Sequence, residues 1–215
     1  MSLKVNEIFY SIQGESSYAG WPCVFVRLTG CNLRCAYCDT QYAYETGLEM
    51  DIKDILDRIS FYNCRLVEVT GGEPLLQSET PDLIMHLLNK GYKVLLETNG
   101  SMDIGVVDKR CARIMDIKCP SSGEKERNDP DNLKRLGEKD ELKFVIADRA
   151  DYEYAKEILE IIDRVRPGSV PVHFSPCFGR IDIRELSHWI LEDFLDVRLN
   201  LQLHKFIWDP HERGV

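Results

Sequence analysis

Residues 23–40 read Cys-Val-Phe-Val-Arg-Leu-Thr-Gly-Cys-Asn-Leu-Arg-Cys-Ala-Tyr-Cys-Asp-Thr, a short β-rich run followed directly by three closely spaced cysteines. Cys31, Cys35 and Cys38 have the spacing Cys-x₃-Cys-x₂-Cys. Three thiolates on one tight loop can bind three irons of a [4Fe–4S] cluster, and the fourth iron then has no protein ligand. Clusters that only carry electrons are usually held by four cysteines. The spacing therefore predicts an iron with an open position, which can bind and reduce a small molecule.

Three other roles are open to these cysteines. Zinc can bind three cysteines and a distant histidine, but structural zinc sites usually contain paired Cys-x₂₋₄-Cys elements. A disulfide framework is disfavoured, because the chain is too large to need one and shows no secretory signal. Simple burial in the core is the third role. It is the role we expect for most of the cysteines that lack ligand spacing, which are Cys23, Cys64, Cys111, Cys119 and Cys177.

Length and composition predict one ordinary soluble domain that spans residues 1–215. Of the 215 residues, 44% are hydrophobic and 29% are charged, values that are normal for a globular protein. The net charge of −9, without any block of Lys and Arg, argues against nucleic acid as a partner. No apolar run approaches the roughly 20 residues of a membrane span, and residues 1–4 do not begin a signal peptide. We therefore expect a cytoplasmic protein with no membrane partner.

Strand and helix patterns alternate along the chain. Strands are expected at 5–11, 23–28, 66–69, 92–97, 113–117, 142–146, 170–174 and 198–204, and helices at 51–59, 82–88, 151–165 and 183–195. The third of these helices is expected to stop at Pro167-Gly168, and the polar segment 121–140 is expected to be a surface excursion. Alternation of this kind predicts a parallel sheet.

The placement of the polar motifs favours one arrangement of that sheet. A doubly wound sheet fits the alternation, but the polar motifs follow successive strands, as they do at the active face of a barrel. The predicted fold is therefore α/β, a partial, open (β/α) barrel of about six parallel strands.

Two polar motifs follow neighbouring strands at this expected face. Thr70-Gly71-Gly72-Glu73-Pro74 comes after the strand at 66–69, and its two glycines let the backbone approach a ligand closely. Alone, such a segment is more often a tight turn, but its position about 32 residues after Cys38 and at the end of a strand favours ligand binding. Thr98-Asn99-Gly100 follows the next strand, where Glu97 or Asn99 can bind a ribose or a substrate; a simple polar turn is the alternative.

The cysteine loop carries further candidates. Tyr37 lies inside the motif, where its ring packs either against a ligand or in the core. Asp39 and Thr40 follow Cys38 directly. A Thr hydroxyl is a weak ligand, but Mg²⁺ takes only one or two protein oxygens and keeps water or substrate oxygens around it.

The motifs resemble two nested families. The cysteine spacing and Gly-Gly-Glu-Pro resemble the radical S-adenosylmethionine (radical SAM) superfamily. Ser11-Ile12-Gln13-Gly14-Glu15-Ser16 and the run from Phe25 to Thr40 resemble the N-terminal signature of the 7-carboxy-7-deazaguanine synthase family. Leu203-His204-Lys205-Phe206 fits the same family, and the resemblance extends from about Val5 to Pro210.

The resemblance implies a radical ring contraction by a carbon–nitrogen lyase. The family converts 6-carboxy-5,6,7,8-tetrahydropterin to 7-carboxy-7-deazaguanine with loss of ammonia, on the path to queuosine and related 7-deazapurines. SAM is cleaved to a 5′-deoxyadenosyl radical and regenerated in each turnover, and Mg²⁺ assists. The fold is a shortened (β/α) barrel, the enzyme is usually a homodimer, and an external flavodoxin-like donor supplies the electron.

The resemblance also implies roles for individual residues. Cys31, Cys35 and Cys38 would hold the cluster, and Thr40 would hold Mg²⁺. The SAM site would be lined by Tyr37, Cys38, Asp39, Gly72, Cys119, Pro120, Ser121, Ser175 and Pro176. The pterin would be held by Ile12, Gln13, Gly14, Glu15, Arg27, Thr70 and His204. No residue is expected to act as a conventional catalytic acid or base, because the cofactor supplies the difficult chemistry.

Some of these roles have a physical basis and a plainer alternative. A carboxylate such as Glu15 suits the guanidine-like N–H edge of a pterin, and the planar fork of Arg27 suits the substrate carboxylate. The alternatives are a surface salt bridge for Arg27 and a structural role for His204. Some relatives end near the position of Pro210, whereas this chain continues through residues 211–215.

Two other functions compete with the synthase. Another radical SAM enzyme, such as a glycyl-radical activating enzyme, leaves Gln13-Gly14-Glu15 unexplained. A non-catalytic metal-binding or electron-transfer module leaves the open iron position and the Gly-Gly-Glu-Pro segment unexplained.

Overall fold

The computed structural model describes residues 1–165, 170–210 and 212–215. The strands in these residues are β1 (Ser2–Ile12), β2 (Pro22–Leu28), β3 (Leu48–Asp51), β4 (Leu66–Gly71), β5 (Lys93–Thr98), β6 (Ala112–Ile117), β7 (Glu141–Ile146), β8 (Val172–Pro176) and β9 (Arg198–Leu199). The helices are α1 (Ile52–Ser60), α2 (Thr80–Asn89), α3 (Asn132–Arg135), α4 (Arg149–Val165), α5 (Ile183–Glu192) and α6 (His204–Ile207). Short 3₁₀ turns are η1 (Ser16–Tyr18), η2 (Gln41–Ala43), η3 (Pro74–Leu76), η4 (Ile104–Val106), η5 (Pro120–Ser122) and η6 (Lys125–Arg127).

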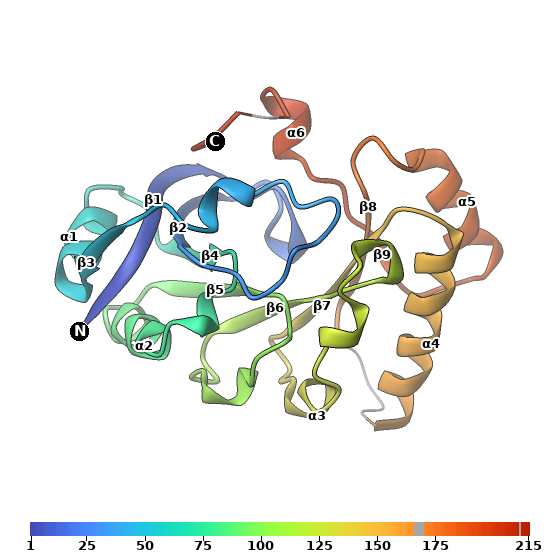
Figure 1. The fold of residues 1–215 in the computed structure, drawn as a ribbon, viewed down its shortest axis with the longest axis horizontal. Coiled ribbons are helices and arrows are strands. Elements are labelled where there is room, and N and C mark those ends of the chain that lie inside the picture. The colour runs from blue at the N-terminus through green and yellow to red at the C-terminus, as the bar shows by residue number, and fades with distance from the viewer. Residues whose placement is uncertain (166–169, 211) are drawn as a thin grey trace.

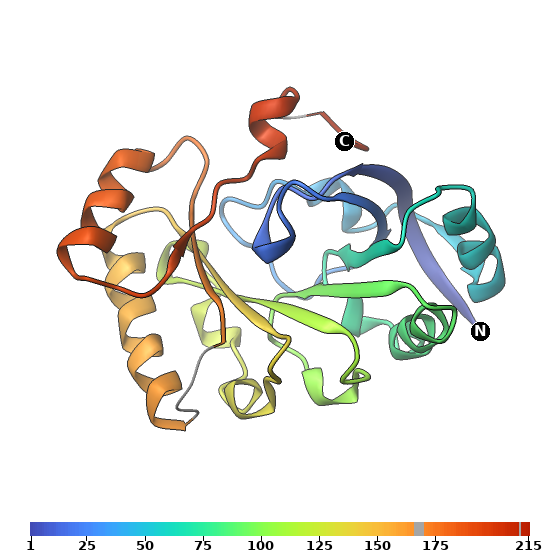
Figure 2. The ribbon, with the colours of Figure 1, turned by 180° about the vertical axis from the view of Figure 1, so that it is seen from behind.

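All of these strands belong to one sheet, in the order β3-β1-β2-β4-β5-β6-β7-β8-β9. From β2 to β9 every neighbouring pair is parallel, whereas β1 pairs antiparallel with both β2 and β3. Within the described residues the sheet ends at β3 and β9 and does not close. Figures 1 and 2 show a curved sheet with helices along its outer side. The expected α/β partial, open barrel is confirmed, with six parallel strands of ordinary length and the two-residue β9.

Alternation along the strands separates an apolar outer face from a polar inner face. In β4, Val67 and Val69 are fully buried in the main core together with the apolar sides of α1 and α2. Glu68 and Thr70 alternate with them and therefore point to the other face, because successive strand residues face opposite sides. They too are buried, at 4% and 5% exposed. The inner face thus encloses polar side chains.

A smaller apolar cluster closes the base of this inner face. Its members are Cys23, Phe25, Leu66, Leu95, Ala112 and Ile114. All of them lie in the first halves of β2, β4, β5 and β6. Polar groups on the inner face are therefore displaced toward the carboxyl ends of the strands, the end at which parallel α/β sheets bind ligands.

Most of the expected elements are confirmed, one expected strand is much shorter than expected, and one strand was missed. The four expected helices appear as α1, α2, α4 and α5 within a few residues of their predicted bounds. The strand expected at 198–204 is only Arg198–Leu199, because the Asn200 side chain turns inward to bond the His173 ring at 3.1 Å and α6 then begins at His204. The strand β3 was not expected.

The segment 121–140 is not simply a surface excursion. Asn132 and Leu133 are buried, and the Asn132 amide donates to the carbonyls of Gly100 and Met102 at 3.0 and 2.7 Å. The predicted helix stop at Pro167-Gly168 lies outside the described residues. None of the helices in the described part of the chain has the length and apolarity that a bilayer crossing requires.

Candidate active site

The cysteine loop follows β2 and is held in place by its neighbours. Cys31, Cys35 and Cys38 are free, partly exposed thiols. The Arg34 guanidinium donates to the carbonyl of Cys31 at 2.8 Å and lies over the Tyr44 ring, 4.2 Å from its centroid. The amide of Ala36 in the same loop donates to the carbonyl of Ser122 at 2.9 Å. Three thiols are therefore presented from one braced loop at the carboxyl end of the sheet.

The Gly-Gly-Glu-Pro segment packs directly on this loop. A Cβ added to Gly72 would lie 2.3 Å from the Gly30 carbonyl oxygen and 2.5 Å from the Cβ of Cys31. The amide of Glu73 donates to the same Gly30 carbonyl at 2.8 Å. Glycine is thus needed at 72 for close backbone contact with the cysteine loop, in addition to any contact with a ligand.

Glu73 joins the loop after β4 to the loop after β5. Its side chain is fully buried and accepts hydrogen bonds from the amides of Leu75 and Asn99 and from the Thr98 hydroxyl, at 3.0, 2.7 and 2.8 Å. Burial raises the pKa of Glu73, and the bonds from Asn99, Leu75 and Thr98 oppose that rise. The side-chain amide of Asn99 in turn donates to the side-chain oxygen of Asn32 in the cysteine loop at 3.2 Å. Three loops are therefore coupled into one unit.

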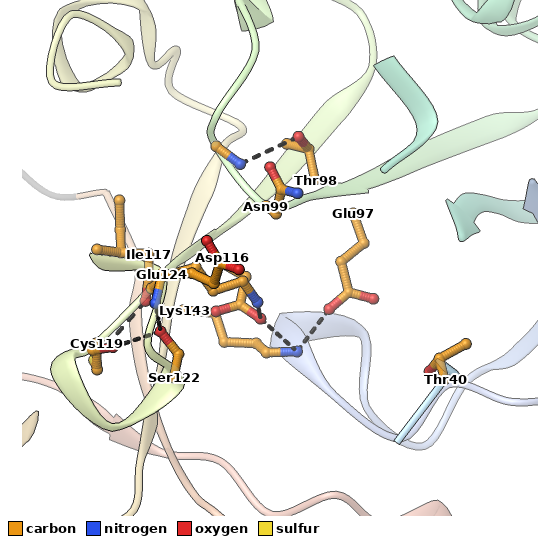
Figure 3. Close-up of polar contacts among 12 residues, drawn as sticks. Thr40, Glu97, Thr98, Asn99, Asp116, Ile117, Cys119, Ser122, Glu124 and Lys143 are labelled. Carbon is orange, nitrogen blue, oxygen red and sulfur yellow. Dashed lines mark hydrogen bonds and ion pairs between the residues drawn. The ribbon is translucent and has the colours of Figure 1, made fainter. Parts of the chain in front are cut away.

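A buried lysine lies at the centre of the inner face. The Lys143 ammonium is 2.5 Å from Glu15 Oε2, 2.6 Å from Glu97 Oε1 and 3.9 Å from Asp116 Oδ2. Figure 3 shows Lys143 with Glu97 and Asp116 beside it. Burial lowers the pKa of Lys143, but the attraction of Glu15 and Glu97 outweighs it and holds that pKa above its ordinary value. The strands thus place one fixed positive charge among carboxylates from three other elements.

The residues expected to hold the pterin meet above this lysine. The amide of Leu203 donates to the Gly14 carbonyl at 2.9 Å, and a Cβ on Gly14 would lie 2.2 Å from Nδ1 of His204. Gln202 donates to Glu15 at 2.9 Å, across 187 residues of sequence. Burial lowers the pKa of His204, while Glu15 opposes that change. The fold therefore brings the Gly14–Glu15 and Gln202–His204 segments into direct contact.

Beneath this contact, Gln13 links the segment to the sheet. Its Oε1 accepts from the amide of Glu15 at 2.9 Å, and its Nε2 donates to Glu68. Ile12 is the last residue of β1. Thr70 donates to Glu97 at 3.3 Å. All the expected pterin residues except Arg27 are thus linked to one another or to their immediate neighbours on the inner face.

Arg27 lies on β2, largely buried between two aromatic rings. Its guanidinium carbon is 5.7 Å from the centroid of Phe9 and 5.8 Å from that of Tyr42, and its Nε is 2.7 Å from Glu7. The side chain is 16% exposed, so the pair is not a surface salt bridge. Among the described residues Glu7 is the one carboxylate within ion-pair distance of Arg27. One edge of the guanidinium therefore stays available for a second anion.

Thr40 and Asp39 form a separate polar group. The Thr40 hydroxyl donates to Asp39 at 3.0 Å, and Lys205 lies 2.7 Å from the other Asp39 oxygen. Burial works against ionisation of Asp39, but Lys205 outweighs it and holds the pKa of this carboxyl below its usual range. In the part of the chain that the structure describes, no group of three or more His, Cys, Asp or Glu is arranged around a single metal ion. A cluster binds each thiolate to a different iron, so its ligands need not converge in that way.

Three buried polar atoms near the cysteine loop have no hydrogen-bond partner among the described residues. They are Tyr37 OH, Asp116 Oδ1 and Ser175 Oγ. Buried polar atoms are normally paired, so this group fits a polar ligand that lies between the cysteine loop, β6 and β8. The three free thiols and the close contact at Gly72 fit an iron–sulfur cluster on the same side.

Two residues expected to line the SAM site use their side chains elsewhere. The thiol of Cys119 is buried in the main outer core, and the Ser121 hydroxyl donates to Asp151, as does its amide at 2.8 Å. Cys119 can therefore reach a ligand only through its backbone, and Ser121 through its backbone or as a hydroxyl acceptor. Figure 3 shows Cys119 and Ser122 together on the loop after β6, and Pro120 begins its 3₁₀ turn. Pro176 ends β8.

Sequence reasoning missed several charged residues of the inner face. Glu68, Asp116 and Lys143 each interrupt an apolar strand, and their alternation places them on the same face of the sheet in β4, β6 and β7. One such charge in a buried strand is costly unless it is paired. A charged residue in each of three apolar strands was the sequence pattern that could have predicted this cluster.

Comparison with known proteins identifies the family. Residues 25–120 match the radical SAM superfamily. The chain is 49% identical to 7-carboxy-7-deazaguanine synthase of Chlorobaculum tepidum, over 99% of this chain and 97% of that protein. It is 45% identical to the enzyme of that name from Koribacter versatilis, over 99% and 100%. The fold is similar to the crystal structure of QueE from Escherichia coli, with a TM-score of 0.81, 23% identity and 95% of each chain covered.

Radical SAM enzymes use an iron–sulfur cluster and SAM, and both fit the groups described above. Relatives of this identity and coverage are decisive for the family, whereas the structural match shows the fold. The chain belongs to the 7-carboxy-7-deazaguanine synthase family of radical SAM enzymes.

Proposed function

We propose that this protein converts 6-carboxy-5,6,7,8-tetrahydropterin to 7-carboxy-7-deazaguanine with loss of ammonia, and that it uses SAM catalytically. Beyond family membership, one observation carries the proposal. Gly14–Glu15 and Gln202–His204, far apart in sequence, meet above the Lys143 carboxylate cluster at the carboxyl end of the sheet. A glycyl-radical activating enzyme acts on a protein and gives this arrangement no role.

The cysteine side of the site would bind the cofactors. Cys31, Cys35 and Cys38 would hold the [4Fe–4S] cluster, and SAM would lie among Tyr37, Asp39, Gly72, Pro120, Ser175 and Pro176 and the backbone of Cys119 and Ser121. When bound, these two groups supply the radical chemistry. The chain's own part is to hold the loop rigid through Gly72 and Glu73 and to offer Asp116 and Ser175 as hydrogen-bond partners.

The opposite side would bind the pterin. Glu15 would accept hydrogen bonds from the guanidine-like edge of the ring, since Lys143 stabilises its ionised form. Arg27 would pair with the substrate carboxylate through its unused edge. Ile12, Gln13, Thr70 and His204 would complete the contact surface. Thr40 would supply one protein oxygen to Mg²⁺, with substrate or water completing its shell.

The remaining features of the proposal come from the family. The protein would act as one domain over residues 1–215 and as a homodimer in the cytoplasm. A flavodoxin-like donor would reduce the cluster. Its product would enter the synthesis of queuosine or related 7-deazapurines.

The test is a product assay under anaerobic conditions. The reconstituted protein is incubated with dithionite, SAM, Mg²⁺ and 6-carboxytetrahydropterin, and the products are identified by mass spectrometry. We expect 7-carboxy-7-deazaguanine to form without stoichiometric consumption of SAM. Release of 5′-deoxyadenosine without any deazapurine would reject this substrate, and no SAM cleavage by protein with a full cluster would reject the enzyme class.

A further inference from the structure

Lys143 lies on the inner face at a position that a pterin-binding role of Glu15 alone does not explain. It is 5% exposed, and its neighbours Leu142 and Phe144 in β7 point into the outer core. A lysine this deeply buried stays charged only if carboxylates surround it. Glu15 comes from the loop after β1 and Glu97 from the end of β5, yet both approach the same ammonium within 2.6 Å.

Each of the two carboxylates is fixed at both of its oxygens. Glu15 is held by Lys143 at one oxygen and by Gln202 at the other, at 2.5 and 2.9 Å. Glu97 is held by Lys143 and, at 3.3 Å, by Thr70. A carboxylate oxygen can accept more than one hydrogen bond, so both groups keep acceptor capacity in a fixed direction.

Without a cation between them, these two partly buried carboxylates would repel each other. Repulsion between like charges favours uptake of a proton by one of the two groups. A protonated carboxyl turns an O–H donor toward the ring edge of a pterin, which itself presents N–H donors. The pair of carboxyl groups then offers the ring fewer hydrogen-bond acceptors.

We propose that Lys143 is a positioning residue for substrate recognition, because its ammonium binds the carboxylates of both Glu15 and Glu97 and holds them directed at one place, where they accept hydrogen bonds jointly from an N–H-rich heterocycle. This inference rests on the proposed function, which supplies the ligand. It adds a residue from β7 and a second acceptor, Glu97, to the recognition of the ring.

The charge balance around the pair sets its response to pH. The groups that face it from the surrounding elements are Arg27 of β2, Glu68 of β4, Asp116 of β6, Lys118 after β6 and His204 of α6. With Lys143 present, binding of the ring is expected to vary little between about pH 6 and pH 9, since the attraction of Lys143 holds the pKa of Glu15 below its ordinary value. With Lys143 removed, binding should recover as the pH rises and the shared proton is lost.

The experiment measures binding of 6-carboxypterin, the oxidised form of the proposed substrate, to the anaerobically reconstituted protein by fluorescence titration. Lys143→Met should weaken binding about tenfold or more at pH 7, because one pKa unit of competition between a proton and the ligand is a tenfold change in affinity. The loss should shrink as the pH rises. Lys143→Arg keeps the charge and should restore most of the affinity. The matched control is Lys156→Met on the outer helix α4, where Lys156 binds Asp193 and Glu153 at 2.6 and 3.3 Å; it should bind as wild type does.

Three results would overturn the inference. The first is wild-type affinity in Lys143→Met, and the second is equal loss in Lys143→Arg at every pH. If Lys143→Met does not fold, the double variant Lys143→Met with Glu97→Gln removes the surplus negative charge. That variant should fold and bind weakly, and wild-type affinity in it is the third contrary result. Failure of the proposed function is recognised separately, since wild-type protein would then bind 6-carboxypterin without forming a deazapurine from the reduced substrate, or would bind no pterin at all.

Discussion

Removal of the Glu73 carboxylate should loosen the cysteine loop and lower the stability of the whole protein. Glu73 is fully buried and accepts from two backbone amides, those of Leu75 and Asn99, and from the Thr98 hydroxyl. In Glu73→Ala these donors lose their acceptor inside the protein.

The size of the effect follows from the groups left unpaired. Each unsatisfied buried donor costs about 1–3 kcal/mol. The Thr98 hydroxyl can rotate toward another acceptor, so the two amides dominate. Burial raises the pKa of Glu73, because the buried carboxylate has lost its hydration. Removing the carboxylate therefore recovers part of this desolvation free energy. We therefore expect Glu73→Ala to lose about 3 kcal/mol. Glu73→Gln keeps one acceptor but places an NH₂ group against the other amide, and should lose about 1–2 kcal/mol.

The assay is urea unfolding of the iron-free, reduced protein, followed by circular dichroism. The matched control is Glu160→Ala on α4, because Glu160 is 72% exposed and pairs with Arg164 at 3.0 Å; an exposed pair of this kind is worth about 0.5 kcal/mol or less. The reasoning is refuted if Glu73→Ala is as stable as this control. It is also refuted if Glu73→Gln is the less stable of the two Glu73 variants.

Three further predictions follow from the site. Gly72→Ala places a Cβ 2.3 Å from the Gly30 carbonyl, so the cysteine loop must shift and the iron and sulfide content after reconstitution should fall well below that of wild type; full content would contradict the packing argument. Arg27→Ala should raise the KM for the pterin by about tenfold or more, as expected for loss of a charged hydrogen bond, while SAM cleavage without substrate survives; equal loss of both activities would count against its role. Burial, with Glu97 and Glu15, holds the pKa of Glu68 well above its ordinary value, so the native protein keeps a proton that the unfolded chain has already released near neutral pH. The free energy of unfolding of the wild type should therefore fall with rising pH relative to that of Glu68→Gln. Urea unfolding at pH 5 and pH 8 measures this difference, and a Glu68→Gln advantage that shrinks over this range would contradict the prediction.

The fold was predictable because its signals are local. The apolar periodicity of 51–59 and 183–195 and the alternation of apolar strands with them are enough to indicate a parallel sheet with outer helices. The ends of elements depend on contacts made later in folding. His204 was placed in a strand because 198–204 looks β-rich, whereas the bonds of Asn200 to His173 and of Leu203 to Gly14 turn the chain into α6.

The site was predictable where a motif carries its own chemistry. The cysteine spacing and the Gln-Gly-Glu segment pointed to residues that the fold does bring to one end of the sheet. Glu68 and Lys143, and the bonding role of Glu73, were missed because they depend on partners far away in sequence. The bond from Glu97 to Lys143, for example, spans 46 residues and is visible only once β5 and β7 face the same side.

The central claim is that Cys31, Cys35 and Cys38 hold a cluster with one iron open to SAM. Electron paramagnetic resonance of the reconstituted, dithionite-reduced protein, before and after addition of SAM labelled with ¹⁵N in its amino group, tests this directly. The account predicts that SAM changes the spectrum of the reduced cluster and that the labelled nitrogen shows hyperfine coupling to it. An unchanged spectrum from protein with a full complement of iron and sulfide would contradict the account.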